Sequence, residues 1–218
     1  MKTLFIEAKY EGKLDLNKIP VNKLPSKIGL ISSVQFVDYL KTIKYYLENK
    51  NKKVFLEKGK QKYKGQILGC DVSSAIKIEK NVISFLYIGD GKFHPLGIAL
   101  KTNKKVYTFN PLNNLFSEIN QSEIEKIKKK NKGKLLKFLS SDNIGILVSV
   151  KPGQFNLKKA LELKNKFKDK SFSIFLFDTL TINDLENFPF IESWVNTACP
   201  RIGDEENKII NLDDLNQL

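Results

Sequence analysis

The stretch that decides the fold is ISFLYIGDGKFHPLGIAL, residues 83–100. Its first part, 83–89, is a nearly continuous apolar run, which predicts a buried strand. The glycine-rich loop GDGKFHP follows, and PLGIAL then starts a helix with Pro95 in its first turn, where proline is favoured. A buried strand, a glycine-rich loop and a helix in this order are typical of a parallel sheet in an α/β protein.

The same alternation continues in both directions along the chain. Apolar runs predict further strands at 28–34, 53–57, 105–111, 144–150, 172–177 and 192–198. Helical spacing of apolar residues predicts helices after residue 34, in VSSAIKI with Asp71 or Ser73 as its cap, at about 117–140, near 156–169 and near 182–188. QILGC (66–70) is a short apolar segment that runs into a turn, and the polar tail after Arg201 predicts a short edge element or a loose end.

We therefore expect the α/β class, with two Rossmann-like βα domains and mostly parallel sheets. The long charged helix divides the chain into a first domain, 1–118, which carries Cys70, and a second, 119–218, which carries Cys199. Functional loops of such folds lie at the carboxyl ends of the strands. Cys70, the GDGKFHP loop and Cys199 all follow apolar segments, so we expect them to converge on a cleft between the halves.

Composition narrows the class of protein. The chain has 218 residues, no long apolar run and a start without an apolar leader, which predicts a cytoplasmic protein with no membrane span. Its net charge of +13 comes from scattered lysines. Arginine, which nucleic-acid readers favour, occurs once, and no aromatic RNA-binding signature is present, so we expect no nucleic-acid partner.

The scarce residue types gather in three stretches, which contain Cys70, His94, Trp194, Cys199 and Arg201. Free cysteines most often pack as small hydrophobes, and a lone histidine is most often a packed or capping residue. Metal ligation, a redox pair or a nucleophile beside His94 are the alternatives for the cysteines, although no CxxC spacing occurs. The GDG loop has the backbone to cradle an anion, but it matches neither a P-loop nor GxGxxG.

Five motifs in order, YKGQILGCDVSSA, FLYIGDGKFHPLGIAL, FNP, IGILVSVKPGQ and WVNTACPRI, resemble the diphthamide synthesis family, the 2-(3-amino-3-carboxypropyl)histidine synthases. The early stretch GLISSVQFVDYLKTIKYYLE is similar to the start of that family's middle domain. The resemblance covers nearly the whole chain.

The resemblance implies a transferase that uses a 4Fe–4S cluster and S-adenosylmethionine. An electron from the cluster cleaves the bond between sulfur and the methionine Cγ, and the 3-amino-3-carboxypropyl radical adds to a histidine of elongation factor 2. Each of three similar domains gives one cluster cysteine, which assigns Cys70 and Cys199 as iron ligands. Arginine occurs once in this lysine-rich chain, and its planar fork suits a carboxylate, so beside such a cluster we expect Arg201 to bind the methionyl carboxylate. The other residues that we expect to bind the cosubstrate are Gln66, Ser73, Gly89, Gly91 and His94.

The sequence departs from the family in its cysteine count. The matching region starts at the middle domain, and the chain has two cysteines where the family uses three. Asp71, Asp90 or His94 are possible replacements, but their spacing does not favour them. We expect a separate chain, in a homo- or hetero-oligomer, to supply the first domain and the third cysteine. The alternatives are an accessory or electron-delivery subunit and a shortened paralogue with a binding role.

Overall fold

The structure is a computed structural model that describes residues 4–215. The chain forms two compact units, Met1–Glu125 and Lys126–Leu218, called unit 1 and unit 2 below. They divide within helix α4 (Gln121–Ser140), whereas the sequence predicted a boundary just ahead of that helix.

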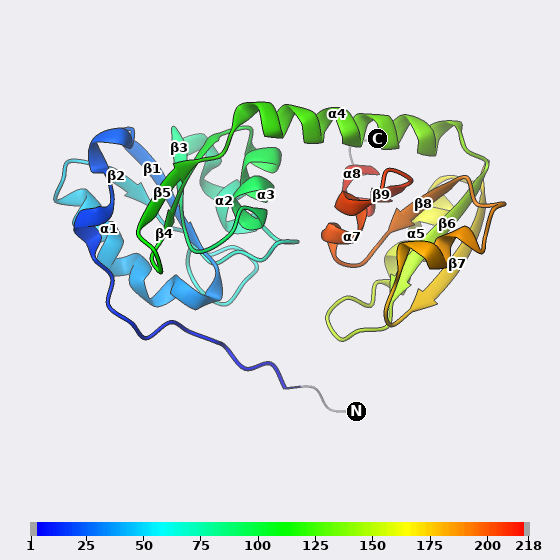
Figure 1. Ribbon diagram of the computed structural model, residues 1–218, viewed down its shortest axis with the longest axis horizontal. Coiled ribbons are helices and arrows are strands. Elements are labelled where there is room, and N and C mark those ends of the chain that lie inside the picture. The colour runs from blue at the N-terminus through cyan, green and yellow to red at the C-terminus, as the bar shows by residue number, and fades with distance from the viewer. Residues whose placement is uncertain (1–3, 216–218) are drawn as a thin grey trace. The chain divides into compact units, whose positions relative to one another are not determined.

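Unit 1 is a five-stranded sheet with helices on both faces (Figure 1). Its elements are η1 (Leu16–Lys18), η2 (Val21–Lys23), β1 (Lys27–Ser32), η3 (Val34–Tyr39), α1 (Leu40–Glu48), β2 (Lys53–Phe55), α2 (Ser73–Ile78), η4 (Glu79–Asn81), β3 (Ser84–Ile88), α3 (Phe93–Thr102), β4 (Lys105–Asn110) and β5 (Leu115–Glu118). The strand order is β2-β1-β3-β4-β5. All pairs are parallel except β4 with β5.

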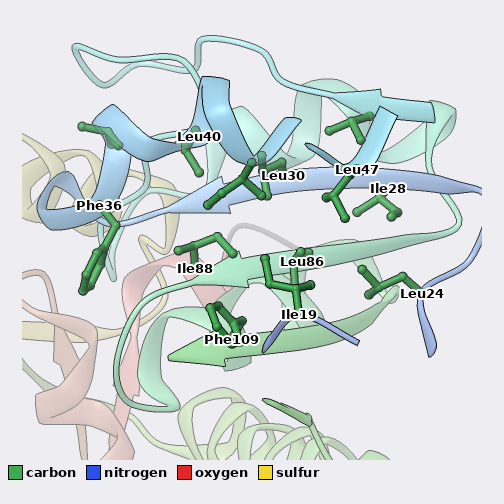
Figure 2. Packing of buried hydrophobic residues seen from close by; sticks show 13 residues of the cluster. Ile19, Leu24, Ile28, Leu30, Phe36, Leu40, Leu47, Leu86, Ile88 and Phe109 are labelled. Carbon is green, nitrogen blue, oxygen red and sulfur yellow. The ribbon is translucent and has the colours of Figure 1, made fainter. Parts of the chain in front are cut away.

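The apolar runs of the central strands are explained by burial on both faces of the sheet. Along β1, Leu30 faces the cluster that contains α1, and its neighbour Ile31 faces the cluster that contains α2 and α3. Figure 2 shows the first of these clusters, where side chains of β1, β3 and β4 pack against Leu40 and Leu47 of α1. A strand buried on both faces reads as a continuous apolar run, which is why 83–89 was decisive.

Unit 2 repeats this architecture with four strands, in the order β7-β6-β8-β9, all parallel. Its elements after α4 are β6 (Asn143–Ser149), α5 (Leu157–Lys166), β7 (Ser171–Phe177), α6 (Ile182–Glu186), β8 (Ser193–Asn196), α7 (Pro200–Glu205), β9 (Ile209–Asn211) and α8 (Leu212–Leu215). Alternate residues of β6 again face two clusters, one with Phe138 and Leu163, the other with Trp194 and Leu185. The fold is the predicted α/β class.

One prediction on local structure needs correction. Residues 117 and 118 are not helical but belong to β5, which pairs with β4 after a turn in which Asn114 adopts a positive φ of 58°. The helix begins at Gln121, after Asn120, whose side-chain oxygen accepts a hydrogen bond from the Ser122 N–H at 2.9 Å. The tail after Arg201 continues α7 and then forms β9, the edge strand beside β8, which confirms the first of its two predicted alternatives, a short edge element.

Across residues 4–215, each helix is either too short or too polar to cross a membrane.

Candidate functional site

The strand order of unit 1 creates a switch point at the carboxyl end of β1. The chain passes from β1 to β2 on one side and returns to β3 on the other, and ligands of α/β folds bind at such points. The crossover from β2 runs past this edge: Ser32 N–H donates to Gly65 O and Ile67 N–H donates to Ser32 O, each at 2.9 Å. These bonds bring the segment that carries Cys70 to the carboxyl edge of the sheet.

Cys70 is presented by a tight turn. Leu68 and Asp71 exchange backbone hydrogen bonds of 3.0 and 3.1 Å, which leaves Cys70 exposed at the tip. Gly69 packs directly on the ring of Phe93, so a methyl group at this position would overlap the ring. The Cys70 turn is therefore seated on the first turn of α3, next to the glycine-rich loop.

Three polar side chains hold the Cys70 segment in place. Gln66 is buried, and its Oε1 accepts a hydrogen bond from the Tyr63 N–H at 3.0 Å. The Ser73 hydroxyl accepts one from the Lys60 N–H at 2.7 Å. Burial of Asp71 tends to raise its pKa, but hydrogen bonds from Gln61 and Ser73 outweigh this and lower the pKa below its usual value. Gln66 and Ser73 thus hold the loop; their predicted contact with the cosubstrate stays a prediction.

The glycine-rich loop after β3 needs its glycines. Gly89 and Gly91 have φ values of 153° and 71°, which side chains rarely adopt. A methyl group on Gly89 would also lie 2.6 Å from the Tyr87 hydroxyl oxygen. The loop is tied down where Asn110, at the end of β4, donates to the Asp90 carboxylate at 2.8 Å.

His94 lies half-buried at the start of α3. Its ring stacks on Tyr87 at a centroid distance of 5.9 Å and meets Phe93 edge-on at 5.7 Å. Burial lowers the His94 pKa below its ordinary value of 6.5, so the imidazole is neutral at pH 7. Burial raises the pKa of Tyr87 to about 12, so this hydroxyl stays protonated. The aromatic side chains beside the Cys70 turn, Tyr87, Phe93 and His94, are therefore uncharged at pH 7.

Cys199 lies at the corresponding edge of unit 2, but in a different loop. Whereas Cys70 lies in the crossover before β3, Cys199 follows β8 directly and is the N-cap of α7. The Thr197 hydroxyl and N–H both bind Leu147 O, at 2.8 and 3.1 Å, which fixes the loop to β6. Cys199 is partly exposed, and neither cysteine of the chain, both of which are described, forms a disulfide.

Two asparagines, Asn196 and Asn211, hold the Cys199 loop through hydrogen bonds. Asn196, 2% exposed, donates to Cys199 O at 2.8 Å and to Asn211 Oδ1 at 2.7 Å, and its own Oδ1 accepts from the Ala198 N–H at 3.0 Å. Asn211 of β9 donates to Pro200 O at 3.0 Å. The sequence analysis missed these two residues; their signal is that each is the last residue of a strand, ahead of a helix.

The other two rare residues of WVNTACPRIG (194–203), Arg201 and Trp194, differ in burial. Arg201 is exposed on α7, two positions beyond Cys199. Trp194 is buried in the core, with ring centroids 4.8 Å from Phe175 and 6.2 Å from Phe188. The tryptophan therefore stabilises unit 2, whereas Cys199 is partly exposed and Arg201 is exposed.

The donor set for a metal is incomplete within each unit. Across residues 4–215, no three His, Cys, Asp or Glu side chains lie close enough together to hold an ion. The chain offers two thiols, and thiolates are the ligands of iron–sulfur clusters, so the residues present fit part of such a site. Two surface hollows contain none of the residues predicted to bind S-adenosylmethionine. The first, of about 420 Å³, is lined by Lys126, Lys129, Lys130, Gly133, Lys134 and Asn207. The second, of about 370 Å³, is lined by Gly12, Lys13, Leu14, Leu16, Tyr39 and Thr42.

Two parallel α/β units, each with a cysteine at the carboxyl edge of its sheet, define an α/β protein with candidate thiolate ligands. A family model described as "Putative diphthamide synthesis protein" matches residues 1–208. The chain belongs to the diphthamide synthesis family, which confirms the resemblance seen in its motifs.

Individual relatives agree. The 2-(3-amino-3-carboxypropyl)histidine synthase of Pyrococcus horikoshii is 33% identical over 186 residues, 84% of this chain and 52% of that protein. Subunit 1 of the Homo sapiens enzyme is 24% identical over 178 residues, 80% of this chain and 40% of that protein. The crystal structure of Dph2 from Pyrococcus horikoshii with a 4Fe–4S cluster has a TM-score of 0.78 and 30% identity, over 90% of this chain and 58% of that one. This chain thus spans about half the length of the curated relatives that it matches.

Proposed function

We propose that this chain is part of a diphthamide synthase in which Cys70 and Cys199 are two ligands of one 4Fe–4S cluster. The third cysteine and the first domain come from another chain in the same oligomer. The reaction transfers the 3-amino-3-carboxypropyl group of S-adenosylmethionine to a histidine of elongation factor 2. When bound, the cluster supplies the electron that cleaves the sulfur–carbon bond of the cosubstrate.

The observation that carries this proposal is the exposure of both cysteines. A cysteine that serves only packing is among the most buried residues of a protein. Here Cys70 is exposed at the tip of its turn and Cys199 is partly exposed at the start of α7, and both lie at the carboxyl edge of a parallel sheet. Membership of the family makes iron–sulfur ligation the role that fits two such thiols.

Arg201 is the candidate for binding the cosubstrate carboxylate. It is the only arginine among 37 basic residues, and a planar guanidinium makes two parallel hydrogen bonds to a carboxylate, which an ammonium does not. Arg201 is exposed on α7 and lies two residues beyond Cys199 in the sequence, and we propose that it contacts a ligand bound at that thiol.

Anaerobic reconstitution with iron and sulfide tests the ligand assignment. We expect little cluster on this chain alone, because two thiolates do not complete a three-thiolate site, and a full 4Fe–4S signal after addition of a chain that carries the first domain. In that assembly Cys70→Ala and Cys199→Ala each abolish iron binding, while Asp90→Asn, in the neighbouring loop, retains it. Full iron content in either cysteine variant refutes the assignment.

The role of Arg201 has a separate test. Arg201→Lys is expected to retain the cluster and to weaken S-adenosylmethionine binding about tenfold or more, because one ammonium replaces a bidentate fork. Isothermal titration of the reconstituted assembly with S-adenosylmethionine measures this directly. Unchanged affinity removes Arg201 from the cosubstrate site and leaves the cysteine assignment as it was.

A further inference from the structure

Two lysines of α4 bind the far end of the helix that starts at Cys199. Helix α7 has six residues, too few to be stable by itself. Its last carbonyl groups lack partners within the helix, as at every helix C-terminus. Lys134 Nζ donates to Gly203 O, and Lys130 Nζ donates to Asp204 O at 2.6 Å. Cations at this end also interact favourably with the helix dipole.

Lys134 is unusual among the lysines of this chain because it is buried. It is 5% exposed, and burial together with the charge of Lys130 lowers its pKa. A buried ammonium costs free energy unless a specific hydrogen bond compensates it. The compensating partner here is the Gly203 carbonyl.

The opposite side of α7 is fixed by close packing. A methyl group at Gly203 would overlap the Asn211 carboxamide, and that same side chain donates to Pro200 O at 3.0 Å. Helix α7 is therefore held both by Asn211 on β9 and by the two lysines on α4. Because Cys199 is its N-cap, a shift of α7 moves the thiol.

We propose that Lys134, assisted by Lys130, is a positioning residue for Cys199: it binds the C-terminal carbonyl groups of α7 and so fixes the loop at the other end of that helix. An anion site in the same lysine-lined hollow is the weaker interpretation. Two of its four lysines already bind carbonyl groups, and the carboxylates of Asp204, Asp214 and Glu206 act on Lys134. The inference rests on the proposed role of Cys199 for its functional meaning only.

Thiol alkylation of the full chain, reduced and without iron, tests the proposal. The chain carries its own reference, since Cys70 lies in the other unit, and its own probe of unit 2, since the single tryptophan is Trp194. Peptide mass spectrometry follows the iodoacetamide reaction of each cysteine. Lys134→Met keeps the length of the side chain and removes its donor. Lys129→Met, in the same hollow, is the matched control.

We expect the Cys199-to-Cys70 rate ratio to rise in Lys134→Met, because the loop that partly covers Cys199 opens more often. Loss of one buried hydrogen bond increases opening about fivefold to tenfold, and this is the upper limit of the rise, since Cys199 is already partly exposed. Lys130→Met gives a smaller rise, and Lys129→Met gives none. Native Trp194 emission stays unchanged, and low urea does not accelerate the Cys199 reaction, because the opening is local.

Three results overturn the proposal. The ratio stays at its wild-type value in Lys134→Met; it rises equally in Lys129→Met; or it follows the urea dependence of Trp194 unfolding, which means that the whole unit has loosened. If Lys134→Met does not fold, Lys130→Met decides alone, because that lysine is less buried. Iron plays no part in this assay, so a failed reconstitution leaves its result unaffected.

Discussion

Replacing Asn196 with alanine should destabilise unit 2 strongly, although the side chain is small and polar. Asn196→Ala removes three hydrogen bonds and leaves Cys199 O, Asn211 Oδ1 and the Ala198 N–H without that partner. At about 1 kcal/mol for each bond, the free energy of unfolding falls by about 3 kcal/mol. Asn211→Ala removes two bonds, one of them shared with Asn196, and costs about 2 kcal/mol.

The shared bond gives the prediction its sharpest form. The double variant loses the shared bond only once, so its free energy of unfolding should fall by about 4 kcal/mol, whereas the two single variants add up to about 5 kcal/mol. The difference is a coupling of about 1 kcal/mol between Asn196 and Asn211. Urea unfolding followed by Trp194 fluorescence measures all three variants in the unit that contains them. With an m-value of about 1.5 kcal/mol/M, the Asn196→Ala midpoint falls by about 2 M.

Asn165→Ala is the matched control, since Asn165 is exposed on α5 of the same unit. It should leave the free energy of unfolding within about 0.5 kcal/mol of wild type. A loss below about 1 kcal/mol in Asn196→Ala, or strictly additive costs in the double variant, refutes the inference that the pair holds the Cys199 loop.

Two further changes test packing and titration. Gly145→Ala places a methyl group on the ring of Trp194 and should lower the free energy of unfolding by about 1–3 kcal/mol in the same fluorescence assay. Gly133→Ala, which has open space around it on α4, should raise that free energy by about 0.5–1 kcal/mol. If Gly133→Ala is the less stable of the two variants, the packing around these glycines is wrong. The pKa of His94 is lower in the folded state than in the unfolded state, so the unfolded chain binds the imidazole proton more tightly. The free energy of unfolding should therefore fall as the pH falls below about 6.5. His94→Gln should lose less stability than wild type between about pH 7.5 and pH 5.5, measured by calorimetry, and parallel losses contradict buried, neutral His94.

The sheets were predictable because their strands carry the signal in the side chains themselves. A strand buried on both faces, such as β3 or β6, reads as a short and nearly continuous apolar run, which the sequence shows directly. The β5 strand was missed because it is an exposed edge with one half-buried side chain, so its residues carry no comparable pattern. Its pairing depends on the turn at Asn114, which a positive φ makes possible.

The rare residues pointed to the two cysteine loops but not to the residues that hold them. Asn196 and Asn211 are 15 residues apart and meet only through the parallel register of β8 and β9, which sequence does not reveal. Lys134 is one lysine among seven in α4. Its one signal is the spacing of four residues to Phe138, which places it on the buried stripe of the helix.

The two cysteines are presented by loops of opposite construction, and this difference has a consequence for the assembly. The Cys70 turn closes on itself through Leu68 and Asp71, and its supports, Gln66 and Ser73, lie within a few residues of it. The Cys199 loop instead depends on contacts distant in sequence, with β9 and with α4. Substitution of Asn211 or Lys134 should therefore disturb Cys199 and spare Cys70, whose own distant contacts are with the ring of Phe93 and the backbone of Ser32. If both thiols bind one cluster, unit 2 is the half through which a distant change loosens it.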